Sequence, residues 1–246
     1  MSDDVVLRTR HVSKKFGRFL ALNDVTIDFR KGNLTSIIGP NGAGKSTFFN
    51  VLTGGLKPTS GEVYFEGRNI TGLPQHEFAR MGIAKSFQIT TIFPSFTVLE
   101  NVRIALQSGV SRYDFFSKKE TLYLEDRAMG LLDTVGLRAH AMRLASEMAH
   151  GQQRALELAI ALALAPKLLL LDEPTAGMSP EETRTMMDLI VELAQQRTVV
   201  LVEHKMKMVM SISDRIVVLH HGELLAEGSA DDIRHNDEVK RVYLGH

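Results

Sequence analysis

The chain has 246 residues, of which 44% are apolar, so it can bury the core of one large domain or of a domain with a subdomain. Its 29 basic and 29 acidic residues cancel, and a net charge of zero gives no broad field that would attract nucleic acid or anionic lipid. It has no cysteines, which excludes disulfides and cysteine metal sites and fits a reducing compartment. No apolar run approaches the roughly 18 residues that cross a bilayer, and the acidic residues 1–4 are unlike a signal peptide, so we expect a cytoplasmic protein.

The first part of the chain predicts an antiparallel layer. Residues 5–12 and 23–29 alternate as half-buried strands do, with 14–17 as the connecting turn, and 62–67 predicts a further strand. Phe16 lies near a strand end, where an aromatic ring could stack on a purine. It could equally be an ordinary core side chain.

A glycine-rich stretch fits the phosphate-binding loop pattern of a glycine, four free positions and Gly-Lys-Ser/Thr. Its residues are Gly39, Pro40, Asn41, Gly42, Ala43, Gly44, Lys45, Ser46 and Thr47. A β-branched and apolar run at 34–38 precedes it, and a short predicted helix follows. The glycines let backbone N–H groups approach phosphate oxygens, and the helix N-terminus adds positive charge. Lys45 can reach the terminal phosphates, and the Ser46 hydroxyl can coordinate Mg²⁺.

The middle of the chain changes character. Residues 82–88 predict a strand that ends in the amide of Gln88, at a hinge position before an irregular, proline-containing stretch. From 98 to about 165 the apolar spacing becomes helical, with a polar and aromatic break at 108–114. We interpret this region as a helical lobe inserted between core strands, with an ordinary part of the core as the alternative.

Two later strands end in chemically active residues. Four leucines at 168–171 predict a strand buried on both faces, as in a parallel sheet, followed by Asp172 and Glu173. Asp172 could hold the hydration shell of Mg²⁺, and Glu173 could polarise an attacking water. The apolar strand at 198–204 ends in His204, which could hydrogen-bond a γ-phosphate oxygen or that water.

The C-terminal segments predict structure more than chemistry. Three methionines at 206, 208 and 210 are interpreted as core fillers in preference to a soft-metal surface. Residues 216–219 and 223–227 predict a hairpin around His220, His221 and Gly222, where a metal site is not expected.

Taken together, these residues resemble the ATP-binding subunits of ATP-binding cassette (ABC) transporters over essentially the whole chain. The resemblance implies an α/β fold, with a P-loop NTPase (RecA-like) core, an antiparallel β subdomain and an inserted helical subdomain. It implies one ABC ATPase domain over 1–246, with the nucleotide-binding core and β subdomain at about 1–88 and 166–246 and the helical subdomain at 89–165.

The resemblance also assigns roles. Phe16 is similar to the aromatic that stacks on adenine, and residues 39–47 to the Walker A loop. Gln88 is similar to the glutamine that senses magnesium and contacts the membrane partner. Residues 168–172 resemble the Walker B strand. The implied cofactors are ATP and Mg²⁺. The implied catalytic residues are Glu173, His204, Gln88 and Lys45, and the implied metal ligands are Ser46, Gln88 and Asp172.

The family signature, usually Leu-Ser-Gly-Gly-Gln, is matched in part by residues 148–154. Ala149 stands where a serine usually contacts the γ-phosphate of ATP held by the opposite subunit, and His150 replaces a glycine. Binding must then rely on backbone N–H groups around Gly151 and Gln152 at the helix N-terminus. Ser179 also stands where many members carry an aspartate. These departures bear on the strength of the ATP-bound dimer and leave the fold unchanged.

Within the family, residues 151–154, 172–180, 202–204 and 239–245 look like the subgroup that serves branched-chain amino acid importers, although Lys205 replaces an expected aspartate. The same subgroup includes urea and amide importers. This resemblance implies an ATPase at the cytoplasmic face of the inner membrane, paired head to tail with an identical or different ATP-binding subunit. Integral membrane permeases would dock near residues 88–101, with an extracytoplasmic solute-binding protein as an indirect partner and no nucleic acid.

Two other functions are weighed against this one. A soluble ABC-type ATPase acting on nucleic acid or ribosomes is disfavoured because no sustained heptads lie between Thr47 and Asp172, and because the chain has one cassette and no net charge. A nucleotide-gated binding module with negligible turnover is raised by Ala149. The retention of Glu173 and His204 argues against it.

Overall fold

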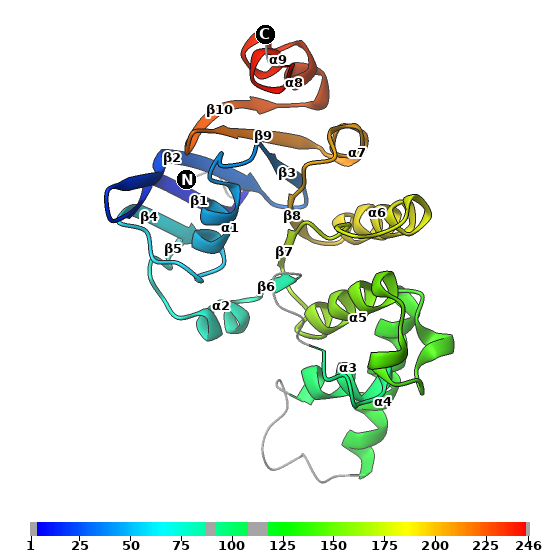
Figure 1. Cartoon of the computed structure of the whole chain (residues 1–246). Coiled ribbons are helices and arrows are strands. Elements are labelled where there is room, and N and C mark those ends of the chain that lie inside the picture. Colours follow the sequence, from blue (N-terminus) through cyan, green and yellow to red (C-terminus); the bar gives the residue numbers. More distant parts are fainter. Residues whose placement is uncertain (1–3, 87–91, 108–117, 245–246) are drawn as a thin grey trace. The chain divides into compact units, whose positions relative to one another are not determined.

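The computed structural model describes residues 4–86, 92–107 and 118–244, which form two compact units (Figure 1). Unit 1 comprises Met1–Ile83, Lys167–Glu173 and Ile190–His246, and unit 2 comprises Ala84–Pro166 and Pro174–Leu189. The predicted subdomain boundaries at 88/89 and 165/166 stay a prediction.

The first sheet of unit 1 is antiparallel, with strand order β2-β1-β4-β5. Its strands are β1 (Val5–Phe16), β2 (Phe19–Arg30), β4 (Ser60–Phe65) and β5 (Arg68–Asn69). The predicted turn at 14–17 is wrong in extent, because β1 continues to Phe16 and pairs it with Phe19. Gly17 adopts a left-handed φ of 58°, and this conformation lets two residues, Gly17 and Arg18, close the hairpin.

The second sheet has the strand order β10-β9-β3-β8-β7-β6. Its strands are β3 (Leu34–Ile38), β6 (Ile83–Ser86), β7 (Leu168–Asp172), β8 (Thr198–Val202), β9 (Arg215–His220) and β10 (Glu223–Gly228). Strand β3 pairs in parallel with β8 and β9, β7 pairs in parallel with β8, and β10 is antiparallel to β9. Every residue of β3 and β8 is buried, as are the four leucines of β7, which confirms the predicted parallel, two-faced burial.

The β9–β10 hairpin closes on His221 and Gly222, whose φ angles are 48° and 81°. Two successive left-handed residues are what a type I′ turn requires. The predicted hairpin is therefore confirmed, with His220 as the last residue of its first strand.

Helices cover both faces of the second sheet in unit 1. They are α1 (Lys45–Leu52), α2 (Gln75–Met81), α7 (Met206–Ile212), α8 (Ala230–His235) and α9 (Asp237–Leu244). Phe48 and Phe49 of α1 are buried in one cluster with Phe29 of β2 and Leu170 of β7, so α1 joins the two sheets. On the opposite face, Val218 belongs to a second cluster with residues of α7, α8 and α9.

The methionines of α7 contribute to this second cluster. Met206 and Met210 are partly buried and pack against it, which confirms the interpretation as core fillers for these two, while it stays a prediction for Met208.

Unit 2 is largely helical. It contains α3 (Val98–Gln107), α4 (Lys118–Thr134), α5 (His150–Ala163) and the first part of α6 (Pro180–Ala194), with short 3₁₀ turns at Arg138–His140 and Ala145–Glu147. Helices α3, α4 and α5 pack against one another. The predicted helical character of this region is confirmed, while the predicted break at 108–114 lies outside the described residues. Within the described ranges, no helix is both long and apolar enough to cross a bilayer.

The burial of β7 leads to a stability prediction. Leu170 is fully buried, and its replacement by alanine should lower the free energy of unfolding by about 2–5 kcal/mol through lost apolar contact and a residual cavity. Urea unfolding of Leu170→Ala measures this loss. Leu20, which is 37% exposed on β2, is the matched control, and Leu20→Ala should cost less than about 1 kcal/mol. Equal losses would contradict the packing described for β7.

Candidate functional site

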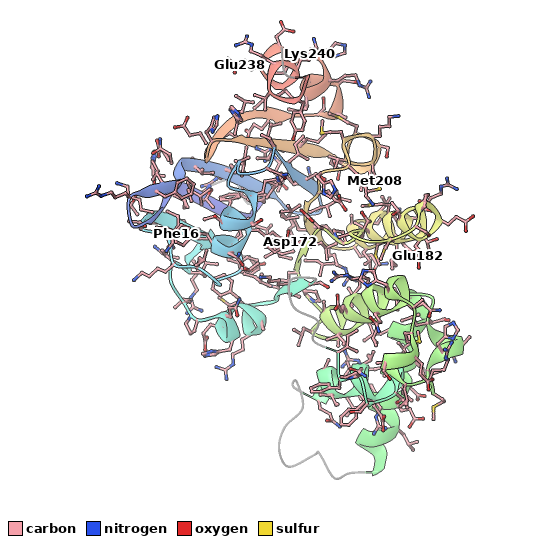
Figure 2. All side chains as sticks on the ribbon, viewed as in Figure 1. Phe16, Asp172, Glu182, Met208, Glu238 and Lys240 are labelled. Carbon is pink, nitrogen blue, oxygen red and sulfur yellow. The ribbon has the colours of Figure 1, made fainter. Side chains whose placement is uncertain are left out.

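The sheet order of unit 1 gathers the polar residues that follow three separate strands. Strand β8 lies between β3 and β7, and Val202 of β8 pairs with both Ile37 and Asp172. Carboxyl ends of parallel strands meet at one edge of the sheet, which is where such sheets bind ligands. The loop after β3, Glu173 after β7 and His204 after β8 therefore emerge together. Figure 2 shows Asp172 at the carboxyl end of β7.

The loop between β3 and α1 leaves no room for side chains at two glycines. A Cβ on Gly39 would lie 2.3 Å from the Leu219 carbonyl oxygen, and a Cβ on Gly44 would lie 2.8 Å from that of Ala21. The loop is further held by a 3.0 Å hydrogen bond from Gly222 N–H to the Ala43 carbonyl. Gly44 is the N-cap of α1 and provides no side-chain cap, so the backbone N–H groups of the first turn face a ligand position. These features fit a phosphate cradle.

The ammonium of Lys45 is held across this loop. Its Nζ donates hydrogen bonds to the carbonyl oxygens of Gly39, at 2.7 Å, and Pro40, at 3.0 Å. Burial lowers the pKa of Lys45, while the negative charges of Glu173 and Asp172 act in the opposite direction and favour the ammonium form. Lys45 is thus a cation placed beside both the loop and the two carboxylates.

Glu173 and His204 form the second half of the site. The His204 Nδ1 atom is 3.8 Å from Glu173 Oε1, and both side chains are about half exposed and accessible to a ligand. Glu173 has a φ of 46°, a left-handed conformation that strains a non-glycine residue by about 1–3 kcal/mol and is typical of functional positions. A 2.9 Å hydrogen bond from its N–H to the Val202 carbonyl holds that conformation in place.

Glu203 is a residue that the sequence interpretation missed. Its side chain is completely buried, and it accepts a 3.0 Å hydrogen bond from the backbone N–H of His204. Its carboxylate also lies 3.9 Å from His204 Nδ1, so it contacts both the backbone and the ring of the histidine. The available signal was an acidic residue directly after an apolar strand, where an unpaired charge is costly to bury.

The donor set fits magnesium. Ser46 is exposed in the first turn of α1, and Asp172 is the last residue of β7, so a hydroxyl and a carboxylate could supply the hard oxygen ligands that Mg²⁺ prefers. Within the described ranges, no group of three or more histidine, aspartate or glutamate side chains could hold a metal ion. Mg²⁺ would therefore take its remaining ligands from phosphates and water, as is usual at nucleotide sites.

Phe16 is not a core side chain. It is 46% exposed at the end of β1, and the Lys14 Nζ lies 5.3 Å from the centroid of its ring. The alternative of an ordinary core phenylalanine is therefore wrong. Stacking on a purine stays a prediction for this residue, which Figure 2 labels in unit 1.

The four predicted signature residues lie together in unit 2, at the N-terminus of α5. Ala149 is the N-cap, and its N–H donates a 3.1 Å hydrogen bond to Gln152 Oε1, but its methyl group cannot accept one in return. The His150 Nε2 atom lies 3.1 Å from the Ala176 carbonyl oxygen and so ties the helix to the segment after β7. Gly151 is the second residue of α5 and lies between His150 and Gln152 in its first turn. Gln88 lies outside the described residues.

Ser179 replaces an expected aspartate without loss of a helix cap. Its hydroxyl accepts a 3.2 Å hydrogen bond from Glu182 N–H, and its own N–H donates to Glu182 Oε2 at 2.9 Å. This reciprocal pair is a capping box for α6.

This arrangement of glycine loop, lysine, carboxylates and histidine at a parallel sheet edge is that of a P-loop nucleoside triphosphatase, and the chain belongs to the ABC transporter family. The family model described as "ABC transporter" matches residues 22–176. A second model, described as "Branched-chain amino acid ATP-binding cassette transporter", matches residues 223–246.

Curated relatives match nearly the whole chain. It is 43% identical to the "High-affinity branched-chain amino acid transport ATP-binding protein LivG" of Salmonella typhimurium, over 98% of both chains. It is 40% identical to the corresponding BraF protein of Pseudomonas aeruginosa, again over 98% of both.

Solved structures agree with the fold. A nucleotide-free ATP-binding cassette from an ABC transporter superposes with a TM-score of 0.85 at 33% identity, covering 98% of this chain and 100% of that one. The dimeric structure of a bacterial ABC transporter cassette gives 0.79 at 30% identity, covering 91% and 98%. The predicted fold class is confirmed.

The crowding at Gly39 leads to a binding prediction. Gly39→Ala would push a methyl group against the Leu219 carbonyl and displace the loop, so we expect at least a tenfold weaker affinity for ATP, about 1.4 kcal/mol, in a titration with a fluorescent ATP analogue. Gly130→Ala on α4 is the control, because a Cβ there meets nothing within 4 Å and alanine favours a helix. Unchanged ATP affinity in Gly39→Ala would exclude this loop as the phosphate cradle.

Proposed function

We propose that this protein is the ATP-binding and ATP-hydrolysing subunit of an ABC importer that takes up branched-chain amino acids. The observation that carries the proposal is the convergence of the Lys45 loop, Asp172, Glu173 and His204 at the shared edge of β3, β8 and β7. ATP would bind with its phosphates on the backbone N–H groups of 39–44 and with Lys45 on the terminal phosphates. Phe16 would stack on adenine.

Hydrolysis would use the residues that emerge beside this loop. Ser46, Asp172 and Gln88 would hold Mg²⁺, which supplies charge neutralisation on the phosphate oxygens when bound. Glu173, fixed by its left-handed backbone, would orient the attacking water and take its proton, and His204 would hydrogen-bond the γ-phosphate. Lys45 would stabilise charge that develops on the transferred phosphoryl group.

The signature residues support pairing with a second ATP-binding subunit. Ala149, His150, Gly151 and Gln152 would bind the γ-phosphate of a nucleotide held by the second subunit in a head-to-tail dimer, through N–H groups at the start of α5. The related cassette solved as a dimer supports this assembly. Closure around two ATP molecules would change the arrangement of the docked permeases, and hydrolysis would reset it.

An exposed aromatic surface lies in the region predicted to dock the permeases. Phe93 and Phe96 are 48% and 42% exposed, with ring centroids 5.5 Å apart. Leu144 is also exposed and forms an isolated bridge with Thr97 beside them. Exposed apolar groups of this kind mark interaction surfaces. Under this proposal, they would contact a cytoplasmic loop of a permease.

The substrate is inferred from the relatives and from the C-terminal family match. Both name branched-chain amino acid transport. The match at 223–246 covers β10, α8 and α9. The permeases and an extracytoplasmic binding protein would select the solute.

Removal of the Glu173 carboxylate tests the chemical assignment. Glu173→Gln keeps the size of the side chain, so ATP binding should be retained while hydrolysis falls by about 10²–10⁴-fold, the range for loss of a general base. Equilibrium ATP binding and phosphate release measure the two quantities. Glu181→Gln, an exposed carboxylate on α6, is the charge control and should hydrolyse ATP normally. Normal turnover in Glu173→Gln would show that another group handles the water.

Copurification tests the assembly and the substrate. The tagged protein, isolated from membranes of its native cell, should bring down multi-span permeases, and its ATPase rate should rise when a branched-chain amino acid and its binding protein are added. Urea and amides serve as comparison solutes. Recovery of ribosomal or DNA-associated partners without a permease would refute the transporter function.

A further inference from the structure

A carboxylate of the same chain lies at the N-terminus of α5, the signature helix, where the signature residues 149–152 are found. Glu182, labelled in Figure 2, lies in the first turn of α6, and its carboxylate lies against Gly151 in the first turn of α5, where the backbone N–H of Gly151 helps to lower its pKa. A Cβ on Gly151 would lie 2.4 Å from Glu182 Oε1, so the carboxylate rests directly on this glycine. The contact lies within unit 2 and depends on the absence of a side chain at residue 151.

The other oxygen of the same carboxylate has a separate partner. Glu182 Oε2 accepts the Ser179 N–H at 2.9 Å as part of the capping box of α6. The hydrogen bonds with Ser179 are the main cause that lowers the pKa of Glu182, and His150 and the backbone N–H of Gly151 act in the same direction. The carboxylate is therefore ionised at neutral pH and bridges the N-termini of two helices.

This position is the one that the proposed function assigns to a γ-phosphate. A carboxylate and a phosphate oxygen are both anions that bind helix N–H groups, so they compete for Gly151 and repel each other at close range. The usual signature serine would add a hydroxyl to the phosphate side of this competition. Ala149 adds no hydroxyl, so in this chain phosphate binding at α5 depends more strongly on the Gly151 N–H, which the Glu182 carboxylate also contacts.

We propose that Glu182 is an internal competitor of ATP at the signature helix, which must leave Gly151 before the second subunit's nucleotide can bind there. This inference rests on the proposed function. It makes Glu182 a positioning residue that sets how much ATP is needed to close the dimer.

The surroundings of Glu182 allow it to leave without unfolding α6. Rotation of the carboxylate can release Gly151 while the contact with Ser179 persists, so α6 keeps its cap. A cavity of about 370 Å³ borders both Gly151 and Glu182, and its other walls include Thr185, Met186 and Leu189 of α6. The cavity provides space for the displaced group.

The test measures ATP-driven dimer formation by light scattering in the hydrolysis-deficient Glu173→Gln chain. Adding Glu182→Gln keeps the shape and a neutral acceptor but removes the charge, so the ATP concentration for half-maximal dimerisation should fall about tenfold, on the order expected for one screened repulsion. Hydrogen exchange of residues 149–153 without nucleotide should become faster, because a neutral amide binds Gly151 N–H less strongly than a carboxylate.

Two controls separate this role from a structural one. Glu181→Gln removes the neighbouring carboxylate, and Ser179→Ala removes one half of the capping box but leaves the charge of Glu182. Neither should reduce the ATP requirement. An unchanged or higher ATP requirement in Glu182→Gln would overturn the competitor role and make Glu182 a brace. If the Glu173→Gln parent bound ATP but formed no dimer at any ATP concentration, the self-paired head-to-tail assembly would fail as well.

Discussion

The parallel pairing of β3, β8 and β7 is the constraint on which the function of this chain depends. The pairing is set by buried β-branched and leucine side chains, which have no chemistry of their own. Because the sheet is parallel, every strand delivers the next residue of the chain to the same edge. Lys45, Glu173 and His204 are far apart in sequence, and their proximity follows from strand order alone.

Local patterns predicted most of this machinery. The glycine loop and the four-leucine strand are recognisable because their chemistry and their backbone requirements are encoded in contiguous residues. The end of β1 was misplaced because lysines and an exposed phenylalanine carry little apolar alternation, although Gly17 is well suited to the tighter turn. Glu203 and Glu182 were not predicted as functional residues. Glu203 is marked in the sequence only as an acidic residue directly after an apolar strand, and Gly151, which the Glu182 carboxylate contacts, is remote from it in sequence.

The departures from the family signature have different structural consequences. Ser179 replaces an aspartate and still caps α6 through its hydroxyl. His150 replaces a glycine and gains a hydrogen bond with the Ala176 carbonyl, so the start of α5 is tied to the segment after β7. Ala149 leaves the N-cap of α5 without a side-chain acceptor, and the carboxylate of Glu182 lies against the first turn of that helix at Gly151. In the proposed dimer the signature would therefore offer a phosphate one side-chain donor fewer than serine provides, while His150 ties it to its own unit.

The hydrogen bonds of Lys45 to the Gly39 and Pro40 carbonyls bear on what happens after hydrolysis. A buried ammonium that lost its phosphate partners would be strongly destabilised if nothing replaced them. Here the loop's own carbonyls of Gly39 and Pro40 accept hydrogen bonds from the ammonium, so the protein itself supplies partners for this charge. Under the proposed function, departure of ADP would therefore leave the ammonium hydrogen-bonded to the loop.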